Sequence, residues 1–244
     1  MLPKITLVTP SLNQAQFLEE TIQSILSQNY PNLEYIIVDG GSTDGSVDII
    51  RKYEKHLAWW VSEPDRGQSH AINKGIEKAS GEIFNWVNSD DLLASGALQA
   101  VSEEYMQYPE ADVLCGFYTA VQNDETFPKT RLGIYKELEK MMVFGHVSPC
   151  CMFWKLEKFR QIGRLDERLH YCMDLEFWHR YLLKNGLSGL HIFDREIAIF
   201  RFHKNSKSAV KSEGFRKDRF NLQYSLINSL VVPGFVRNHY KGIG

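Results

Sequence analysis

The first 90 residues alternate between short apolar runs and segments with helical periodicity. The apolar runs occupy residues 5–8, 35–38, 58–61 and 83–87. The helical spacing is clearest for Phe17, Leu18, Ile22, Ile25 and Leu26, and a further helix is expected at 69–80. Continuous apolar runs are typical of parallel strands buried on both faces. Strands that alternate with helices are joined by right-handed crossovers, so this half predicts an α/β fold with a parallel sheet.

From residue 91 onward the pattern is less regular. Helical patterns cover residues 97–108, 156–162 and 173–185, and strand-like runs cover 113–121, 149–154 and 187–193. Residues 122–144 have no clear period, apart from helical content at 135–142. No linker or repeat separates the two halves. We therefore expect one domain over residues 1–210, whose second half (101–210) extends the sheet of the first (1–100), followed by a tail at 211–244.

The composition is that of an ordinary globular protein. The chain has 244 residues, of which 43% are hydrophobic and 24% charged. A chain of this length can bury an ample core without disulfide or metal staples. The four cysteines, at 115, 150, 151 and 172, form no C-x-x-C pair, which indicates a reduced, cytoplasmic protein. We expect no signal peptide and no transmembrane helix.

The charge is balanced overall but uneven along the chain. The net charge of −2 excludes a polycation that coats nucleic acid. Residues 1–200 carry 19 Lys and Arg against 28 Asp and Glu, whereas residues 201–244 carry 9 against 2. Two interpretations of the basic tail stay open. It is either a solvated basic face or a peripheral contact with an anionic membrane, to which its apolar residues at 226–236 would add.

Polar and acidic residues follow each predicted strand of the first half. In an open α/β sheet, ligands bind outside the carboxyl ends of the strands. The chain contains no G-x-G-x-x-G, P-loop, G-x-S-x-G or H-E-x-x-H motif, so the common nucleotide, hydrolase and zinc signatures are absent. Asp90 and Asp91 stand together after the fourth strand. Adjacent carboxylates repel one another unless a cation such as Mg²⁺ or Mn²⁺ neutralises them, or one of them caps a helix.

Four motifs occur in order: TPSLN (9–13), IVDGGSTDG (37–45), GE (81–82) and NSDD (88–91). Together they resemble the inverting family 2 glycosyltransferases of bacterial type, which have the GT-A fold, a Rossmann-like and mostly parallel sheet flanked by helices. The run at 63–75 resembles one bacterial branch of that family. The resemblance makes residues 1–100 the nucleotide-sugar-binding half and residues 101–210 the acceptor and base half.

The resemblance also implies roles for individual residues. Thr9 and Asp39 would meet the base and ribose of a nucleotide sugar, and Arg66 would lie near the nucleotide or diphosphate. Asp90 and Asp91 would hold Mg²⁺ or Mn²⁺, and His203 resembles a late-chain histidine that reaches the metal or diphosphate. The remaining donor-binding candidates share the same loops: Pro10, Ser11, Gln68, Asn88 and Ser89.

Two positions depart from the family pattern, and one acid completes it. Gly40 stands where many members have a second acid, so the resemblance does not imply a direct acid contact to a uracil ring from this motif. Asn88 occupies the first position of D-x-D-D.

An inverting transfer also needs a base for the acceptor hydroxyl. The stretch YCMDLEFW (171–178) resembles the acidic stretch of the family at a helix start, and we assign the base to Asp174 there, while helix capping is its alternative role.

The sequence therefore predicts a metal-dependent inverting glycosyltransferase. It would use a nucleotide-diphosphate sugar donor and a saccharide or lipid-linked acceptor, as in bacterial surface polysaccharide synthesis. A nucleotidyltransferase and a non-catalytic GT-A-like binding domain are the alternatives. The expected location is cytoplasmic, with peripheral contact to the inner face of the cell membrane left open.

Overall fold

A mixed sheet forms the centre of the protein. The computed structural model describes residues 1–122, 125–130, 135–144, 149–203, 206–207 and 213–228. The strand order is β3-β2-β1-β4-β8-β6-β9-β5, with β7 paired to β6 at the side. The strands are β1 (Ile5–Ser11), β2 (Leu33–Asp39), β3 (Trp59–Ser62), β4 (Ile83–Trp86), β5 (Leu92–Leu93), β6 (Val113–Gln122), β7 (Glu125–Thr130), β8 (Met152–Lys155) and β9 (Leu190–Phe202).

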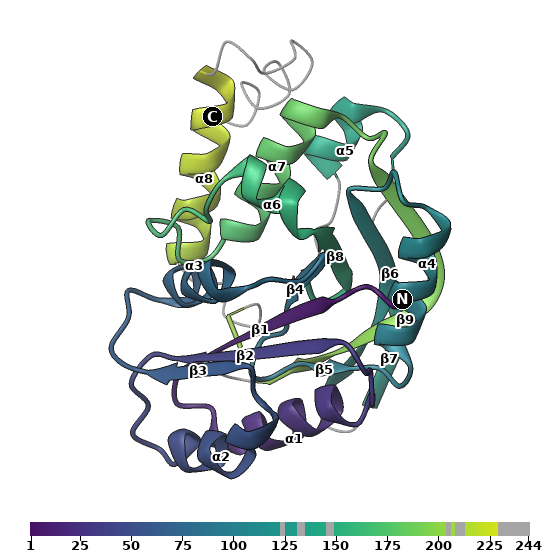
Figure 1. Cartoon of the computed structure of the whole chain (residues 1–244). Helices are drawn as coiled ribbons and strands as arrows, with labels where there is room; N and C mark the ends of the chain where they lie inside the picture. Colours follow the sequence, from purple (N-terminus) through teal and green to yellow (C-terminus); the bar gives the residue numbers. More distant parts are fainter. Residues whose placement is uncertain (123–124, 131–134, 145–148, 204–205, 208–212, 229–244) are drawn as a thin grey trace.

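Helices cover both faces of this sheet. Figure 1 shows α1 and α2 on one face of the β1–β4 part and α3, α6 and α7 on the other. The helices are α1 (Ala15–Leu26), α2 (Ser46–Tyr53), α3 (Gln68–Lys78), α4 (Ala97–Gln107), α5 (Leu138–Phe144), α6 (Leu156–Ile162), α7 (Met173–Asn185) and α8 (Glu213–Asn228), with 3-10 turns at Glu54–His56 and Pro149–Cys151. None of the described helices is long and apolar enough to cross a membrane.

The first half confirms the parallel arrangement predicted from its apolar runs. β1 pairs in parallel with β2 and β4, and β2 pairs in parallel with β3. All seven residues of β1 are buried, as expected for a strand covered on both faces. On α1, Leu18, Ile22 and Ile25 form the predicted apolar stripe and are buried.

The second half extends the same sheet, as predicted, through pairs of both directions. β8 lies antiparallel between β4 and β6, and β9 runs parallel to β6. This order brings the described part of the second half beside the first half within one continuous sheet.

Several predicted element boundaries are wrong. The first strand was expected to end before Pro10, but it continues through Pro10 to Ser11. The strand expected at 149–154 is a 3-10 turn followed by β8. β5, β7 and α8 were not predicted.

The largest difference is in β9, which was expected to end at Phe193. Asp194, Arg195 and Glu196 look like a polar loop in the sequence, and they are exposed. The pairing with β6 shifts register near Phe117, however, and the strand runs on to Phe202. Between Cys115 and Tyr118, β9 contains three more residues than β6, and an irregularity of this kind does not end the strand. Because β9 runs in the same direction as β1 and β4, its extended end lies at the same edge of the sheet as their carboxyl ends.

Candidate active site

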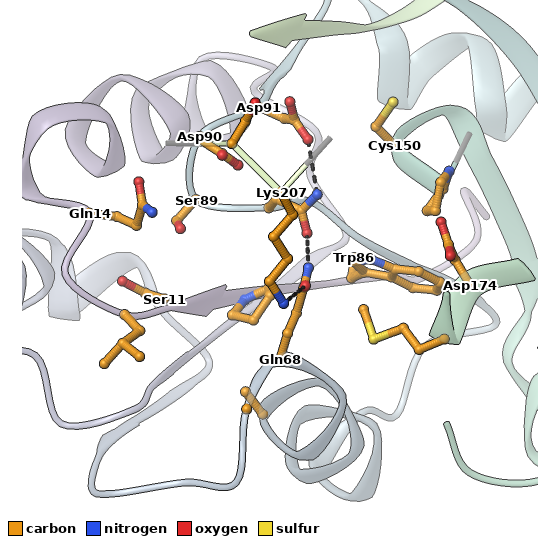
Figure 2. Close-up of a pocket in the computed structure, with 18 of the residues that line it drawn as sticks. Ser11, Gln14, Gln68, Trp86, Ser89, Asp90, Asp91, Cys150, Asp174 and Lys207 are labelled. Atoms are coloured by element: carbon orange, nitrogen blue, oxygen red, sulfur yellow. Dashed lines mark hydrogen bonds between the residues drawn. The ribbon is translucent and has the colours of Figure 1, made fainter. Parts of the chain in front are cut away.

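A cavity of about 440 Å³ opens at the carboxyl ends of β1 and β4. Ligands bind at this place in open α/β sheets. One part of its wall, here called the strand-end wall, contains lining residues from segments 10–14, 65–71 and 86–91. The other part, the C-terminal wall, contains lining residues from segments 118, 149–150, 170–174 and 200–207. In Figure 2, Ser11 and Gln14 lie at one side and Asp174 at the other.

The structure brings most of the predicted site residues to this cavity. The residues on its wall are Pro10, Ser11, Gln68, Asn88, Ser89, Asp90, Asp91 and Asp174. Those that do not line it are Thr9, Asp39, Arg66 and His203. Ser11 lines the cavity, and its buried hydroxyl has no hydrogen-bond partner among the described residues.

Asp90 and Asp91 lie in a tight turn that α1 holds in place. The hydroxyl of Thr21 donates to the carbonyl oxygens of Ser89 at 2.9 Å and Asp91 at 2.8 Å. Asp91 is only 1% exposed. Burial first, and then the negative charge of Asp90, raise the pKa of Asp91 well above the usual range of a carboxyl group.

These residues fit a hard divalent cation. Nε2 of His203 lies 3.0 Å from Oδ2 of Asp90. Two neighbouring ligands of an octahedral ion with bonds of about 2.1 Å are separated by about the same distance. Within the described residues, no group of three His, Cys, Asp or Glu side chains forms a complete metal site. A cation here would therefore need oxygen atoms from a substrate, as Mg²⁺ commonly takes from phosphates.

Asn88, at the position of the missing acid, orients Asp91 instead. Its Nδ2 donates to Oδ2 of Asp91 at 3.0 Å, and its Oδ1 accepts from Nε2 of Gln68 at 2.6 Å. Nζ of Lys207 then donates to Oε1 of Gln68 at 3.0 Å and to the carbonyl of His170 at 3.2 Å. Figure 2 shows this chain of hydrogen bonds from Lys207 to Asp91. It links the two walls of the cavity.

Asp39 and Thr9 are buried behind the strand-end wall. The Asp39 carboxylate accepts from the backbone N–H of Gly41 and Ser42 at 3.0 and 2.8 Å, and from the hydroxyls of Ser42 and Ser62 at 2.6 and 2.7 Å. Asp39 is 0% exposed, so its oxygens are committed to its own loop. The Thr9 hydroxyl lies 3.0 Å from the Tyr35 hydroxyl and is also buried.

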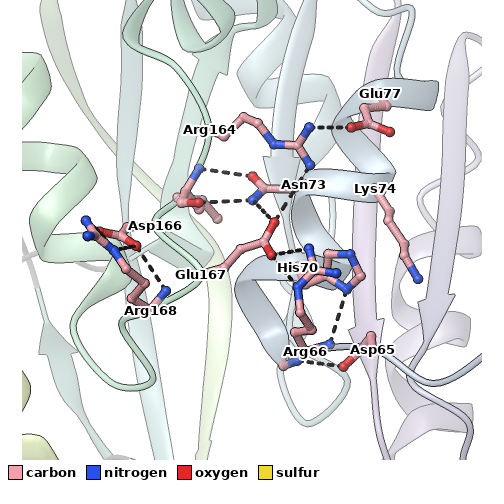
Figure 3. Close-up of polar contacts among 12 residues, drawn as sticks. Asp65, Arg66, His70, Asn73, Lys74, Glu77, Arg164, Asp166, Glu167 and Arg168 are labelled. Atoms are coloured by element: carbon pink, nitrogen blue, oxygen red, sulfur yellow. Dashed lines mark hydrogen bonds and ion pairs between the residues drawn. The ribbon is translucent and has the colours of Figure 1, made fainter.

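Arg66 does not line the cavity. Its side chain is 67% exposed and forms an ion pair with Glu167 at 2.5 Å. Glu167 also accepts from Asn73 at 3.1 Å, and the amide of Asn73 bonds both the N–H and the C=O of Leu165 at 3.0 Å. Figure 3 shows these contacts between α3 and the loop before α7. In this structure, Arg66 helps to hold that loop.

Asp174 and Glu176 have different surroundings at the start of α7. Asp174 lines the cavity. Glu176 forms two hydrogen bonds with Arg180, at 2.6 and 2.8 Å, and does not line it. Of these two carboxylates, only Asp174 is positioned to meet a ligand.

Several lining residues were not singled out from the sequence. The most important are Asp65, beside the candidate Arg66, and Lys207, four residues after His203. The pKa of Lys207 is lowered, because desolvation outweighs the opposing effect of the carboxylates of Asp174 and Asp90. Both residues belong to polar runs that the sequence analysis had recognised. In those runs the predictions named Arg66 and His203 instead. Three aromatic residues of the C-terminal wall, Tyr118, Phe200 and Phe202, depend on the unpredicted end of β9 and its pairing with β6.

Comparisons with known proteins agree on one family. A family model described as "Glycosyl transferase family 2" matches residues 6–166. A putative teichuronic acid biosynthesis glycosyltransferase, TuaG of Bacillus subtilis, is 28% identical over 89% of this chain and 86% of its own length. An uncharacterized glycosyltransferase of Rickettsia typhi is 28% identical over 81% of this chain. The chain spans 63% of that relative and 32% of the glycosyltransferase GlyA of Streptococcus pneumoniae.

Solved structures share the fold. TarS of S. aureus in complex with UDP-GlcNAc gives a TM-score of 0.71 at 18% identity and covers 98% of this chain and 73% of its own. The mannosyltransferase PcManGT of Pyrobaculum calidifontis, in complex with GDP-Man and Mn²⁺, gives 0.68 at 20% identity, covering 99% of this chain and 69% of its own. These matches confirm the fold class that the four motifs predicted.

Proposed function

The chain belongs to glycosyl transferase family 2, and we propose that it transfers a sugar from a nucleoside diphosphate sugar to an acceptor hydroxyl. The acceptor in this proposal is a saccharide or a lipid-linked saccharide, and transfer inverts the anomeric carbon. One observation carries it: a single cavity holds Ser11, Asp90 and Asp91 on one wall and Asp174 on the other.

The strand-end wall would bind the donor. Ser11 would meet the nucleotide, since it lines the cavity at the end of β1. Asp90, Asp91 and His203 would hold Mg²⁺ or Mn²⁺, which when bound offsets the charge of the departing diphosphate. Asn88 and Gln68 keep the Asp91 carboxylate oriented. Thr9 and Asp39 act indirectly in this proposal, because their contacts fix the loops that shape the wall.

The C-terminal wall would supply the base. Asp174 would take the proton of the acceptor hydroxyl as that oxygen attacks the anomeric carbon. The attack comes from the side opposite the departing diphosphate, which gives inversion. Asp174 fits this role because it lines the wall across from Ser11, whereas Glu176 does not line the cavity.

The name of TuaG suggests the setting. We extend it to this chain as a role in bacterial surface polysaccharide synthesis. The family assignment leaves the nucleotidyltransferase alternative without support. A non-catalytic binding domain stays open to experiment.

The experiment is a screen of UDP, GDP, dTDP and CMP sugars with Mn²⁺. Thermal unfolding detects binding, because a ligand of the native state raises stability. Release of nucleotide with a saccharide acceptor detects transfer, and the configuration of the product is then determined by NMR. Stabilisation without transfer would indicate a binding domain. A product with retained configuration would contradict inversion.

The predicted membrane contact of residues 211–244 stays a prediction. Its apolar stretch at 226–236 lies mostly outside the described residues. The described part is α8, which Asp218 ties to the C-terminal wall by accepting from the N–H of His170 at 2.7 Å and Tyr171 at 2.9 Å. Co-sedimentation with anionic liposomes at low and high salt tests the contact. Equal binding by the full chain and by a version ending at Asn228 would rule out residues 229–244 as the anchor.

A further inference from the structure

The end of β2 presents no side chain to a ligand. Asp39 is fully buried, and its carboxylate accepts four hydrogen bonds within its own loop and from Ser62. Gly40 follows it and has no side chain. The backbone N–H of Gly40 donates to the carbonyl of Ser11 at 2.8 Å, so Gly40 lies directly beside the strand-end wall.

Asp65 occupies the space that a side chain at Gly40 would need. A Cβ atom placed on Gly40 would lie only 2.8 Å from Oδ2 of Asp65. Asp65 itself lines the cavity, together with Pro10, Ser11 and Gly67. A carboxylate from the loop after β3 therefore lies where a side chain at position 40 would be.

Only one oxygen of Asp65 is committed. Oδ1 accepts the N–H of Gly67 at 2.7 Å. Gly67 has φ +109°, a conformation that favours glycine and fixes this turn. Among the described residues, no donor is hydrogen-bonded to Oδ2, which lies beside Gly40. Asp65 thus keeps one acceptor oxygen available at the cavity.

The strand order indicates which part of a nucleotide lies there. The order β3-β2-β1-β4 places Asp65, Gly40, Ser11 and Asp90 in that sequence along one edge of the sheet. The edge from β4 to β3 spans three strand spacings, or about 14 Å. A nucleoside diphosphate is long enough to lie along it. With the diphosphate at Asp90 and Asp91, the base falls at the β2–β3 end.

We propose that Asp65 selects the nucleobase of the donor by accepting a hydrogen bond from a ring N–H that lies between two carbonyl groups. Uracil and thymine have this edge. The inference rests on the proposed function and adds the class of base and the residue that recognises it. A guanine edge offers two adjacent donors and would match a carboxylate with both oxygens available. Cytosine has a ring nitrogen that accepts instead, which a carboxylate would repel.

The decisive variant is Asp65→Asn. Its Oδ1 must still accept the N–H of Gly67, so Nδ2 takes the position of Oδ2 and turns an acceptor into a donor. That donor clashes with the N–H of uracil and suits the ring nitrogen of cytosine. We expect the ratio of UDP to CDP affinity, measured by calorimetry with Mn²⁺, to fall tenfold or more, as for the loss of one base-edge contact. An Asp65 that is only structural would weaken both nucleotides alike.

Wild-type protein gives a second test that needs no variant. N3-methyl-UDP should bind tenfold or more weakly than UDP, and comparison of UDP with dTDP decides between the two bases. The matched control is Glu63→Gln, since Glu63 is exposed, pairs with Lys74 at 2.7 Å and does not line the cavity. It should keep the wild-type ratio.

The outcomes separate the two proposals. If UDP binds and Asp65→Asn keeps the wild-type ratio of UDP to CDP, the role of Asp65 is wrong and the proposed function stands. The same holds if wild type binds N3-methyl-UDP as tightly as UDP or prefers GDP. If no nucleoside diphosphate binds with Mn²⁺, both proposals fail.

Discussion

The two walls of the cavity are held by different kinds of contact. At the strand-end wall and directly behind it, acids bond to the backbone of their own loops, as Asp65 does with Gly67 and the buried Asp39 with Gly41. On the C-terminal wall, the loop before α7 is held by residues far away in sequence. Asn73 bonds Leu165, and Asp218 bonds His170 and Tyr171.

The difference shows how the two walls depend on the rest of the chain. Most of the strand-end wall is fixed by short motifs on four parallel strands, while Thr21 of α1 and Arg201 of β9 also bond the Asp90–Asp91 turn. We therefore expect this wall to keep its shape when the contacts of the loop before α7 are changed. The C-terminal wall depends on the docking of α3 and α8. Changes on each wall should therefore separate donor binding from transfer.

The largest difference between the effect on transfer and the effect on donor binding is expected for Asp174→Asn. Transfer should fall by about 10²–10⁴-fold, the usual contribution of a general base. Donor affinity should not change, because the strand-end wall is intact. Steady-state transfer and calorimetry on the same preparation check both. Glu176→Gln is the matched control, and its effect on transfer should be small. Equal losses of affinity and transfer would show that Asp174 is only a structural cap.

Asp91→Asn should act on the opposite wall. Without the carboxylate, transfer should fall by about 10²–10³-fold, since a bound cation contributes several kcal/mol to stabilising charge. The fold should tolerate the change, because burial and the charge of Asp90 already disfavour the ionised form of Asp91 without metal, and Asn resembles the protonated carboxyl group. Thermal unfolding without metal is the check. A variant that transfers sugar at the wild-type rate would contradict the metal assignment.

A third prediction concerns Glu34, at the opposite end of the strands from the cavity. Burial raises its pKa, but hydrogen bonds from Lys4, Ser80 and Thr6 outweigh this and lower the pKa from 4.5 to about 2. The ionised group therefore stabilises the fold fully above pH 4.5, and this stability is lost as the pH falls towards about 2. Glu34→Gln should lower the free energy of unfolding by about 2–3 kcal/mol at pH 7.

Urea unfolding of the Glu34→Gln variant across pH is the measurement. The difference from wild type should shrink between pH 4.5 and 3, and UDP affinity at pH 7 should stay unchanged. Glu103→Gln on the exposed face of α4 is the control, with a change under about 0.5 kcal/mol. A difference that is constant with pH would show that Glu34 is not ionised in the fold.

The smallest effect is expected for Asn73→Ala. It leaves the N–H and C=O of Leu165 without their partner, which should cost about 1–2 kcal/mol of unfolding free energy. Transfer should fall more than donor affinity, because Asn73 holds the loop that precedes Asp174. Glu77→Gln breaks only the exposed ion pair with Arg164 and serves as control. If donor affinity falls and transfer per bound donor does not, the two walls are not separable.

The sequence predicted most of the strand-end wall. The strands β1, β2 and β4 have continuous apolar runs, and their ends carry the motifs directly, so local patterns suffice. The sequence was less informative about which side chains face the cavity. Asp39 is an acid in the right motif, but four hydrogen bonds turn it inward, while Gly40 leaves space for Asp65. Only tertiary packing decides which of two neighbouring acids faces a ligand.

The C-terminal wall could be predicted only in part. Asp174 was singled out because residues 171–178 resemble the acidic stretch of the family at a helix start. Lys207 and the aromatic residues Phe200 and Phe202 were not, because β9 crosses an exposed charged segment before reaching the cavity. Its continuation depends on pairing with β6, which is distant in sequence.

The most direct test of the account is calorimetric titration of UDP into the wild type, Asp91→Asn and Asp174→Asn proteins, with and without Mn²⁺. The account predicts one saturable site in wild type that requires Mn²⁺, its loss in Asp91→Asn and its retention in Asp174→Asn. Binding that is independent of Mn²⁺, or an equal loss of binding in both variants, would contradict the division of the cavity into a donor wall and a base wall.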